Sequence, residues 1–295
     1  KEKNIYICDV GLYSFEPNEK EFKKLEQSKL KDKKNFFQKG DGDGTEKILN
    51  IYTYHGWTSF LKPETNYIKK FHNFKDASKI VDKVSIKTEK LDDINFKNKI
   101  DFFQIDVQGL ESTFIENGAK KISDALVVQM KLSPVPTYKN EKNLTNVLNL
   151  MEKLNFNLNM FHNINTRIFK PMMKEKTSLI EEEDVEQQMI RAFKEGYVEF
   201  IEIAKSTSVG LHTLFQLDCV FVKNYNEIEK LDKEELKKLI LIMFYSYKSY
   251  DFVHYLISHL DKISNTNYLN DYRKLYSALK KRKNTLNQFF NNNLI

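Results

Sequence analysis

The run KIDFFQIDV, from Lys99 to Val107, constrains the fold of this chain more than any other feature. It is a short apolar run that ends in the carboxylate of Asp106, and the segment QGLESTFIENGA after it predicts a helix closing near Asn117 and Gly118. A buried strand followed at once by a helix is the repeating unit of a parallel α/β sheet. The sequence therefore predicts an α/β fold with Asp106 at the carboxyl end of a strand, where open sheets of this class bind ligands.

Other apolar and alternating runs predict the remaining strands. They cover residues 4–10, 12–17, 34–39, 48–54, 84–91, 125–132, 156–161 and 214–223. The loop GDGDGT, after residue 39, is expected to turn the chain between antiparallel strands on its two sides. A helix with Leu144, Val147 and Met151 on one face is expected before residue 156.

The chain is expected to have one main domain and a helical extension. Residues 1–224 are predicted to form the α/β domain, and residues 163–212, with the acidic run EEED, are interpreted as an insertion or lid. Residues 225–295 repeat apolar side chains three and four positions apart. This pattern predicts helices that pack on the domain.

Composition excludes several classes of protein. Apolar residues make up 41% of the chain and charged residues 30%, which supplies a folded core and excludes general disorder. The net charge is +6, but the lysines are interleaved with acids, which argues against a nucleic-acid partner. Neither Cys8 nor Cys219 has metal-ligand spacing, and no run of roughly 18 apolar residues is present to span a membrane. We expect a cytoplasmic protein in a reducing compartment.

Acids at the ends of expected strands are the candidate binding groups. Glu16 ends the second expected strand, where a carboxylate can accept both hydroxyls of a ribose, but it equally fits a surface residue before a proline turn. Asp9 and Gly11 are the candidate acid and close-approach glycine of the first strand. Asp106 either faces a ligand or caps the helix that follows it.

Two long stretches resemble a known enzyme family. IDFFQIDVQGLESTFIENGAKKI and VVQMKLSPVPTYKNEKNLTNVLNLMEKLNFNL resemble the core of FkbM-type methyltransferases, which has a strand ending in I-D-V-E/Q-G-x-E and a loop of the V-P-x-Y kind. LYSFEPNEKEFKKL and GWTSFLKP extend the likeness to roughly residues 5–223. The resemblance implies a Rossmann-like sheet, mostly parallel with an antiparallel last strand. It also implies methyl transfer from S-adenosylmethionine to a hydroxyl, often on a sugar or a polyketide.

The resemblance assigns cofactor-binding roles to residues of the two strand-end motifs. Glu16 would bind the ribose, and Asp9 and Gly11 would lie beneath the methionine end. Asp106 would face the cofactor pocket, with Gln108 beside it in the same motif.

Further acids have two interpretations each. Asp41 or Asp43 would approach the adenine edge, or their loop is an exposed turn. Glu111 matches the second acid of the family motif, or it simply lies in the first helical turn, where the helix dipole favours a negative charge.

The sequence departs from the family in two places. The strand that often reads V-x-x-E reads VVQMKL here, with Gln129 and Lys131, which puts an acid-dependent role at this position in doubt. Gly11 alone separates the first two expected strands, although adjacent parallel strands need a connection of roughly a dozen residues or more. Either a segment is missing between Gly11 and Leu12, or the protein has lost its first strand–helix unit and binds cofactor poorly.

Methyl transfer from a sulfonium to an alcohol requires the oxygen to lie behind the methyl carbon in a site that excludes water. Candidate bases are His55, which equally fits a loop residue without a role, Asp106, and Lys131 if it is neutral in an apolar site. Trp57 could stack on a sugar face. A Mg²⁺ ion held by Asp106 and a neighbouring acid is compatible with the sequence but not demanded by it.

Three functions from different classes fit the sequence to different degrees. A methyltransferase acting on a carbohydrate or other hydroxylated small molecule explains both acid-tipped strands. A nicotinamide oxidoreductase needs a phosphate-cradling glycine motif, which is absent. A catalytically inactive binding module with the methyltransferase fold is the main alternative, because the first motif is incomplete. The helical tail either packs on the domain or forms a homo-oligomer.

Overall fold

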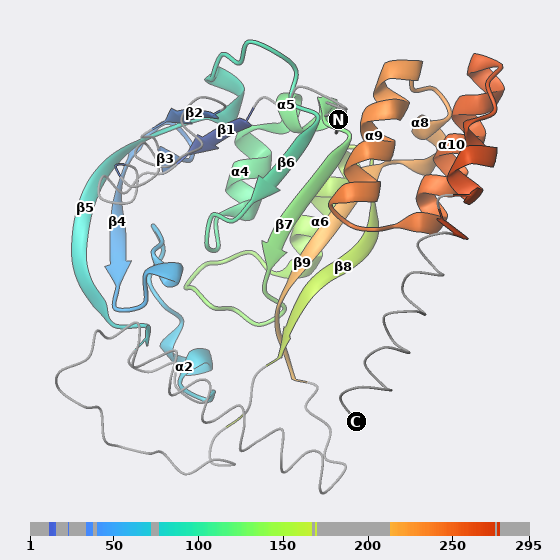
Figure 1. Cartoon of the computed structure of the whole chain (residues 1–295). Helices are drawn as coiled ribbons and strands as arrows, with labels where there is room; N and C mark the ends of the chain where they lie inside the picture. Colours follow the sequence, from blue (N-terminus) through green and yellow to red (C-terminus); the bar gives the residue numbers. More distant parts are fainter. Residues whose placement is uncertain are drawn as a thin grey trace, which may run out of the picture.

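The structure is a computed structural model, and it describes most of the chain as a mixed α/β fold. The described residues are 12–15, 23, 34–37, 40–71, 77–166, 169, 213–274 and 276–277. Figure 1 shows a central sheet with helices on both faces and a curved pair of long strands beside it. In this part of the chain, no helix has the length and apolar character needed to cross a membrane.

The central sheet has four strands in the order β6-β7-β9-β8. β6 (Phe102–Ile105) and β7 (Val127–Leu132) are parallel, whereas β9 (Leu214–Lys223) runs antiparallel to β7 and to β8 (Phe156–Thr166). The reversed direction of β9 agrees with the predicted antiparallel last strand. β9 lies between β7 and β8, so the two strands nearest the middle of the sheet are β7 and β9.

Helices cover both faces of this sheet. α4 (Glu111–Asn117) and α6 (Leu144–Lys153) share an apolar core with one face. α9 (Lys233–Tyr245) and α10 (Tyr250–Ser264) share a second core with the other face. The helices that follow the last strand therefore form one of the two helical layers that pack on the sheet. Short helical elements are η2 (His55–Trp57), α2 (Thr65–Ile68), η3 (Leu91–Asp93), α5 (Ala119–Asp124) and α8 (Tyr225–Ile228).

Two smaller sheets precede the central one in the sequence. β1 (Leu12–Phe15) pairs in parallel with β2 (Lys34–Phe37). In the other sheet β5 (Ile80–Glu89) lies between β3 (Gly40–Asp41) and β4 (Glu46–Tyr52) and is antiparallel to β4. The prediction that the GDGDGT loop joins two paired antiparallel strands is wrong, because the strand before it pairs with β1 and the strand after it pairs with β5.

Several predicted boundaries can be compared with the structure. α4 ends at Asn117 with Gly118 as its C-cap, as predicted. β8 continues to Thr166, so the first residues assigned to the insertion belong to a strand whose backbone pairs with β9. Most of residues 163–212, the expected strand at residues 4–10, and the Gly11–Leu12 junction lie outside the described residues.

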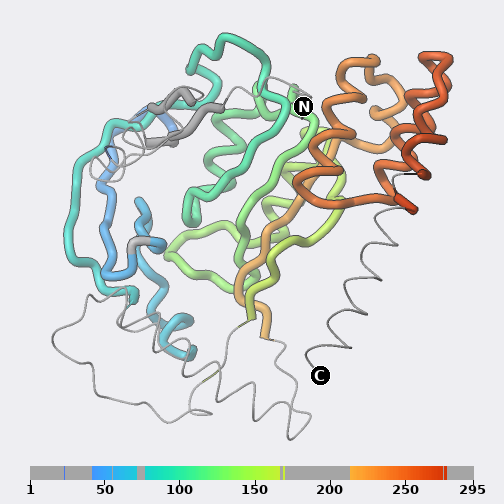
Figure 2. The backbone as a smooth tube through the Cα atoms, viewed as in Figure 1, coloured from blue at the N-terminus to red at the C-terminus, as the bar shows by residue number. Residues whose placement is uncertain are grey.

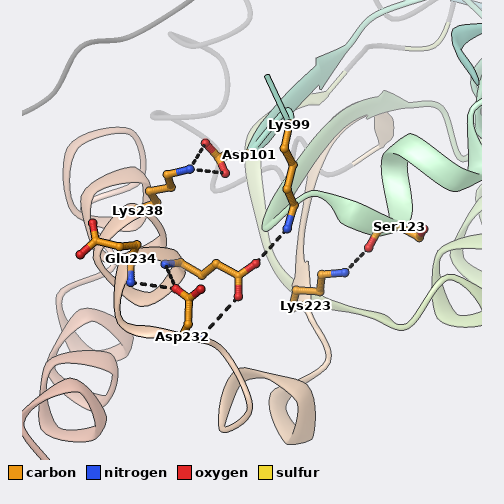
Figure 3. A network of polar contacts seen from close by, with 8 residues as sticks. Lys99, Asp101, Ser123, Lys223, Asp232, Glu234 and Lys238 are labelled. Carbon is orange, nitrogen blue, oxygen red and sulfur yellow. Dashed lines mark hydrogen bonds and ion pairs between the residues drawn. The ribbon is translucent and has the colours of Figure 1, made fainter. Parts of the chain in front are cut away.

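Charged contacts attach the start of α9 to the sheet (Figure 3). Asp232 accepts hydrogen bonds from backbone amides of the first turn, and Glu235 accepts one from the Asp232 amide, which completes a capping box. Glu235 also pairs with Lys99 at 2.8 Å, and Lys238 pairs with Asp101 at 3.0 Å. The same turn is thus capped and held against the segment that leads into β6.

We expect Asp232→Ala to lower the free energy of unfolding by about 1 kcal/mol, because two amides of the first turn lose their acceptor. Urea denaturation followed by circular dichroism measures this loss. Glu234→Ala is the matched control, since it removes a first-turn carboxylate that makes no cap. Equal losses in the two variants would contradict the role of the capping box.

Candidate functional site

Asp106 directly follows β6, at the carboxyl end of the parallel pair β6 and β7. Its Oδ1 accepts a hydrogen bond from Gln108 Nε2 at 2.6 Å, and its Oδ2 forms an ion pair with Lys131 Nζ. Lys131 is on β7, one position beyond the residue that pairs with Ile105. The Asp106 side chain is 41% exposed. The carboxylate is therefore held in one orientation while still open to an incoming group.

The alternative interpretation of Asp106 as a helix cap is wrong. α4 begins at Glu111, its N-cap is Leu110, and no side chain caps it. A loop of left-handed residues separates Asp106 from the helix, with φ of +49° at Gln108 and +95° at Gly109. Asp106 therefore does not cap α4.

Neighbouring segments hold this left-handed loop in place. The Ser59 hydroxyl donates to the Gln108 carbonyl at 2.7 Å, and the Tyr138 hydroxyl lies 3.0 Å from Gln108 Oε1. A Cβ at Gly109 would lie 2.8 Å from the Tyr138 ring, so only glycine fits there. Gln108, which orients Asp106, is consequently held at its backbone by Ser59 and at its side chain by Tyr138.

Tyr138 comes from the loop that follows β7, which reaches across to η2 and the segment after it (Figure 2). The Lys139 amide donates to the Lys62 carbonyl at 2.8 Å, and Tyr138 forms a bridge with Pro63. The Tyr138 ring packs against Trp57, whose residue exposure is 5%. Trp57 is therefore part of the core in this structure, and the expectation that it could stack on a sugar is not met.

The buried Glu111 and the half-buried Glu141 support these loops. Glu111 accepts a hydrogen bond from the Gly109 amide, and Glu141 accepts bonds from the Thr137 and Tyr138 amides. Burial raises the pKa of Glu111 to about 8, with a smaller upward contribution from the charge of Glu141, whereas the backbone hydrogen bonds oppose the rise. Burial likewise raises the pKa of Glu141 to about 7. Glu111 does lie in the first turn of α4, but its burial and raised pKa do not fit a negative charge favoured by the helix dipole, and its match to the second acid of the family motif stays a prediction.

We expect Glu111→Gln to flatten the pH dependence of stability. An unfolded chain releases the Glu111 proton near pH 4.5, whereas the folded protein keeps it until about pH 8, so the free energy of unfolding falls as pH rises through this window. Glutamine preserves the acceptor for the Gly109 amide without a proton to release. Urea denaturation at several pH values measures the slope, and Glu116→Gln, an exposed acid of the same helix, should leave it unchanged. Equal slopes in wild type and Glu111→Gln would contradict the assignment.

The contacts of Lys131 and Asp43 decide between the interpretations of these two residues. Lys131 is a half-exposed cation paired with a carboxylate, which is not the apolar setting that a neutral lysine base requires. Asp43 accepts bonds from Thr45 and pairs with Lys47 at 2.9 Å, and these contacts lower its pKa and occupy its carboxylate within its own turn. That arrangement agrees with the exposed-turn interpretation for Asp43.

Other candidates are placed by their backbone or not at all. Asp41 pairs with Glu89 in the β3–β5 ladder, and His55 begins η2. Their side chains lie outside the described part. Asp9, Gly11 and Glu16 also lie outside it.

Ser59, Tyr138 and Glu141 were not predicted as site residues. Tyr138 stands in the V-P-x-Y stretch, which was the one sequence signal for it. Ser59 stands in the GWTSFLKP stretch, but its contact with Gln108 is 49 residues away in the sequence; Glu141 accepts bonds from amides three and four residues before it, which no periodicity indicated.

The donors around Asp106 do not fit a magnesium ion. Its oxygens face an ammonium and an amide N–H, not a second carboxylate. Among the described residues, no group of three or more histidines, cysteines and acids is placed to hold a metal ion. Both oxygens of Asp106 are thus engaged by hydrogen-bond donors.

We expect Tyr138→Phe to disturb the Asp106 loop without unfolding the protein. The change removes the hydroxyl that lies within 3.0 Å of both the Trp57 carbonyl and Gln108 Oε1, but leaves the buried ring. Stability should fall by about 1–2 kcal/mol, as for the loss of a buried hydrogen bond. Hydrogen exchange of the Gln108 and Gly109 amides should speed up more than that of β9. Uniform acceleration would contradict a local role.

A sequence model described as the methyltransferase FkbM domain matches residues 4–158. This segment is more than half of the chain and contains β6, the Asp106 loop, β7 and Tyr138. No curated protein and no solved structure matches the chain.

Proposed function

The chain belongs to the methyltransferase FkbM domain family, and on that basis we propose that it is an S-adenosylmethionine-dependent O-methyltransferase for a sugar, a polysaccharide or a similar polyhydroxylated acceptor. The observation that carries this proposal is the fixed, half-exposed carboxylate of Asp106 at the carboxyl ends of two parallel strands. Such a group can receive hydroxyl or ammonium hydrogen bonds without further reorganisation.

The described side chains suit this cofactor in charge and placement. S-adenosylmethionine supplies an electrophilic methyl group on a sulfonium. Asp106 offers it a negative charge, and Gln108 and Lys131 hold that charge in place. In this proposal Asp9, Gly11, Glu16 and Asp41 bind the rest of the cofactor, as the family resemblance implies.

The remaining task of the protein is to place an acceptor oxygen behind the methyl carbon and exclude water. His55 and Asp106 are the proposed acceptors for the proton of the hydroxyl. Lys131 contributes by orienting Asp106, since its ammonium is already paired with that carboxylate.

Calorimetric titration of the full chain with S-adenosylmethionine tests the proposal, followed by a screen of sugar nucleotides and glycans with methyl-labelled cofactor. We expect saturable heat and a labelled product that loses the label when the transferred methyl ether is cleaved. Binding without transfer to any acceptor would favour an inactive binding module. Absence of heat and of a thermal shift would refute the cofactor assignment.

We expect Asp106→Ala to abolish detectable cofactor binding while leaving the fold intact, because the side chain is half-exposed and its loss leaves Lys131 without its counter-charge. Calorimetry and thermal melting measure the two effects separately. Asp93→Ala, an exposed acid in η3, is the control and should bind normally. Unchanged affinity in Asp106→Ala would remove Asp106 from the cofactor site.

A further inference from the structure

A row of polar side chains continues from Asp106 across one face of the central sheet. Lys131 of β7 is opposite Asp218 of β9, and Asp218 is opposite His162 of β8. Alternate residues of a strand share a face, so Lys131 and Asp218 point to the same side as Val127 and Val220. Those valines are covered by α9 and α10, whereas the row is half-exposed. The row thus lies where the apolar helical layer ends.

Asp218 is oriented by two side-chain amides. Its Oδ2 accepts hydrogen bonds from Gln129 Nε2 at 3.0 Å and Asn163 Nδ2 at 2.9 Å. Gln129 is buried and receives the Tyr247 hydroxyl on its Oε1 at 2.8 Å, so both ends of the amide are satisfied. Among described residues, Oδ1 of Asp218 receives no hydrogen bond. The carboxylate therefore has a fixed orientation and a spare acceptor.

A break in β8 brings Asn163 to this carboxylate. The register of β8 against β9 shifts between His162 and Asn165, and Asn163 has a left-handed φ of +48°. Irregularities of this kind re-aim side chains and are frequent beside active sites. A regular strand would place Asn163 on the face opposite to His162. The shift therefore brings an amide to a carboxylate that a regular ladder would keep apart.

The chemistry of the row fits an uncharged polyol. A carboxylate accepts hydrogen bonds from hydroxyls, and an adjacent amide both donates and accepts, so the pair can satisfy two neighbouring hydroxyls. The charges of Asp106, Lys131 and Asp218 alternate in sign and sum to −1, which disfavours an anionic ligand.

We propose that Asp218 and Asn163 bind vicinal hydroxyls of the carbohydrate acceptor, with Gln129 as the positioning residue that fixes Asp218. This inference rests on the proposed function. Asp106 and Asp218 are two strand spacings apart, roughly 10 Å. An acceptor held at Asp218 can therefore present another of its hydroxyls beside Asp106.

Saturation-transfer NMR with methyl α-D-glucopyranoside, methyl α-D-mannopyranoside and methyl β-D-galactopyranoside tests the assignment on the full chain. We expect wild type to bind at least one of them and Asp218→Asn to weaken that binding tenfold or more. The amide oxygen introduced by this change can still accept the bonds from Gln129 and Asn163, but the amide nitrogen places donors where a hydroxyl needs an acceptor. The melting temperature and the affinity for S-adenosylmethionine should stay as in wild type. Asp271→Asn, an exposed acid near the end of the described chain, is the control.

The outcomes separate this inference from the proposed function. Unchanged glycoside binding in Asp218→Asn, or no binding of any of the three glycosides to wild type, overturns the acceptor site. Should Asp218→Asn melt early, Asn163→Ala replaces it, because Asn163 is exposed and its loss should weaken glycoside binding alone; unchanged binding there also overturns the site. Failure of wild type to bind S-adenosylmethionine refutes the proposed function instead, whatever the glycosides do.

Discussion

The central constraint on this fold is the burial of β7 and β9 on both faces. Their side chains point alternately into two apolar cores, one shared with α4 and α6 and the other with α9 and α10. Such strands must be apolar along most of their length, because a buried polar group without a partner is costly. Apart from the buried Gln129 and the terminal Lys223, their polar side chains lie toward the end where the helical cover stops. The layer structure therefore decides where chemistry can occur.

The site is built from side chains that restrain one another, and several of the groups that support it lower the stability of the fold. Gln108 is left-handed, Gly109 admits no side chain, and Glu111 and Glu141 are carboxyls held largely away from solvent. Each of these features lowers stability and is tolerated because neighbouring contacts compensate for it. In return the orientation of Asp106 is set before any ligand arrives, which is the condition for electrostatic preorganisation.

The sequence was sufficient for the elements with strong local patterns. The βα unit around Asp106, the end of α4 at Gly118 and the apolar strands β7 and β9 follow from periodicity and capping alone. Pairing was harder, because β4 finds its partner in β5 across a long intervening segment rather than in the preceding strand. Ser59 contacts the backbone carbonyl of a distant residue, and Asn163 reaches Asp218 only because the register of β8 shifts. Neither contact could be predicted from the sequence around these residues.

Lys131 stands where the family pattern V-x-x-E has an acid, and its ion pair with Asp106 explains what this difference does. An acid at this position would have set two negative charges side by side at the ends of β6 and β7, a combination that favours a bound cation. The lysine instead pairs with Asp106 and restricts its carboxylate to a fixed direction. With Asp218 on the next strand, the face alternates in charge rather than accumulating it. A surface of this kind discriminates by hydrogen-bond geometry more than by net charge, which suits the proposed neutral polyhydroxylated acceptor.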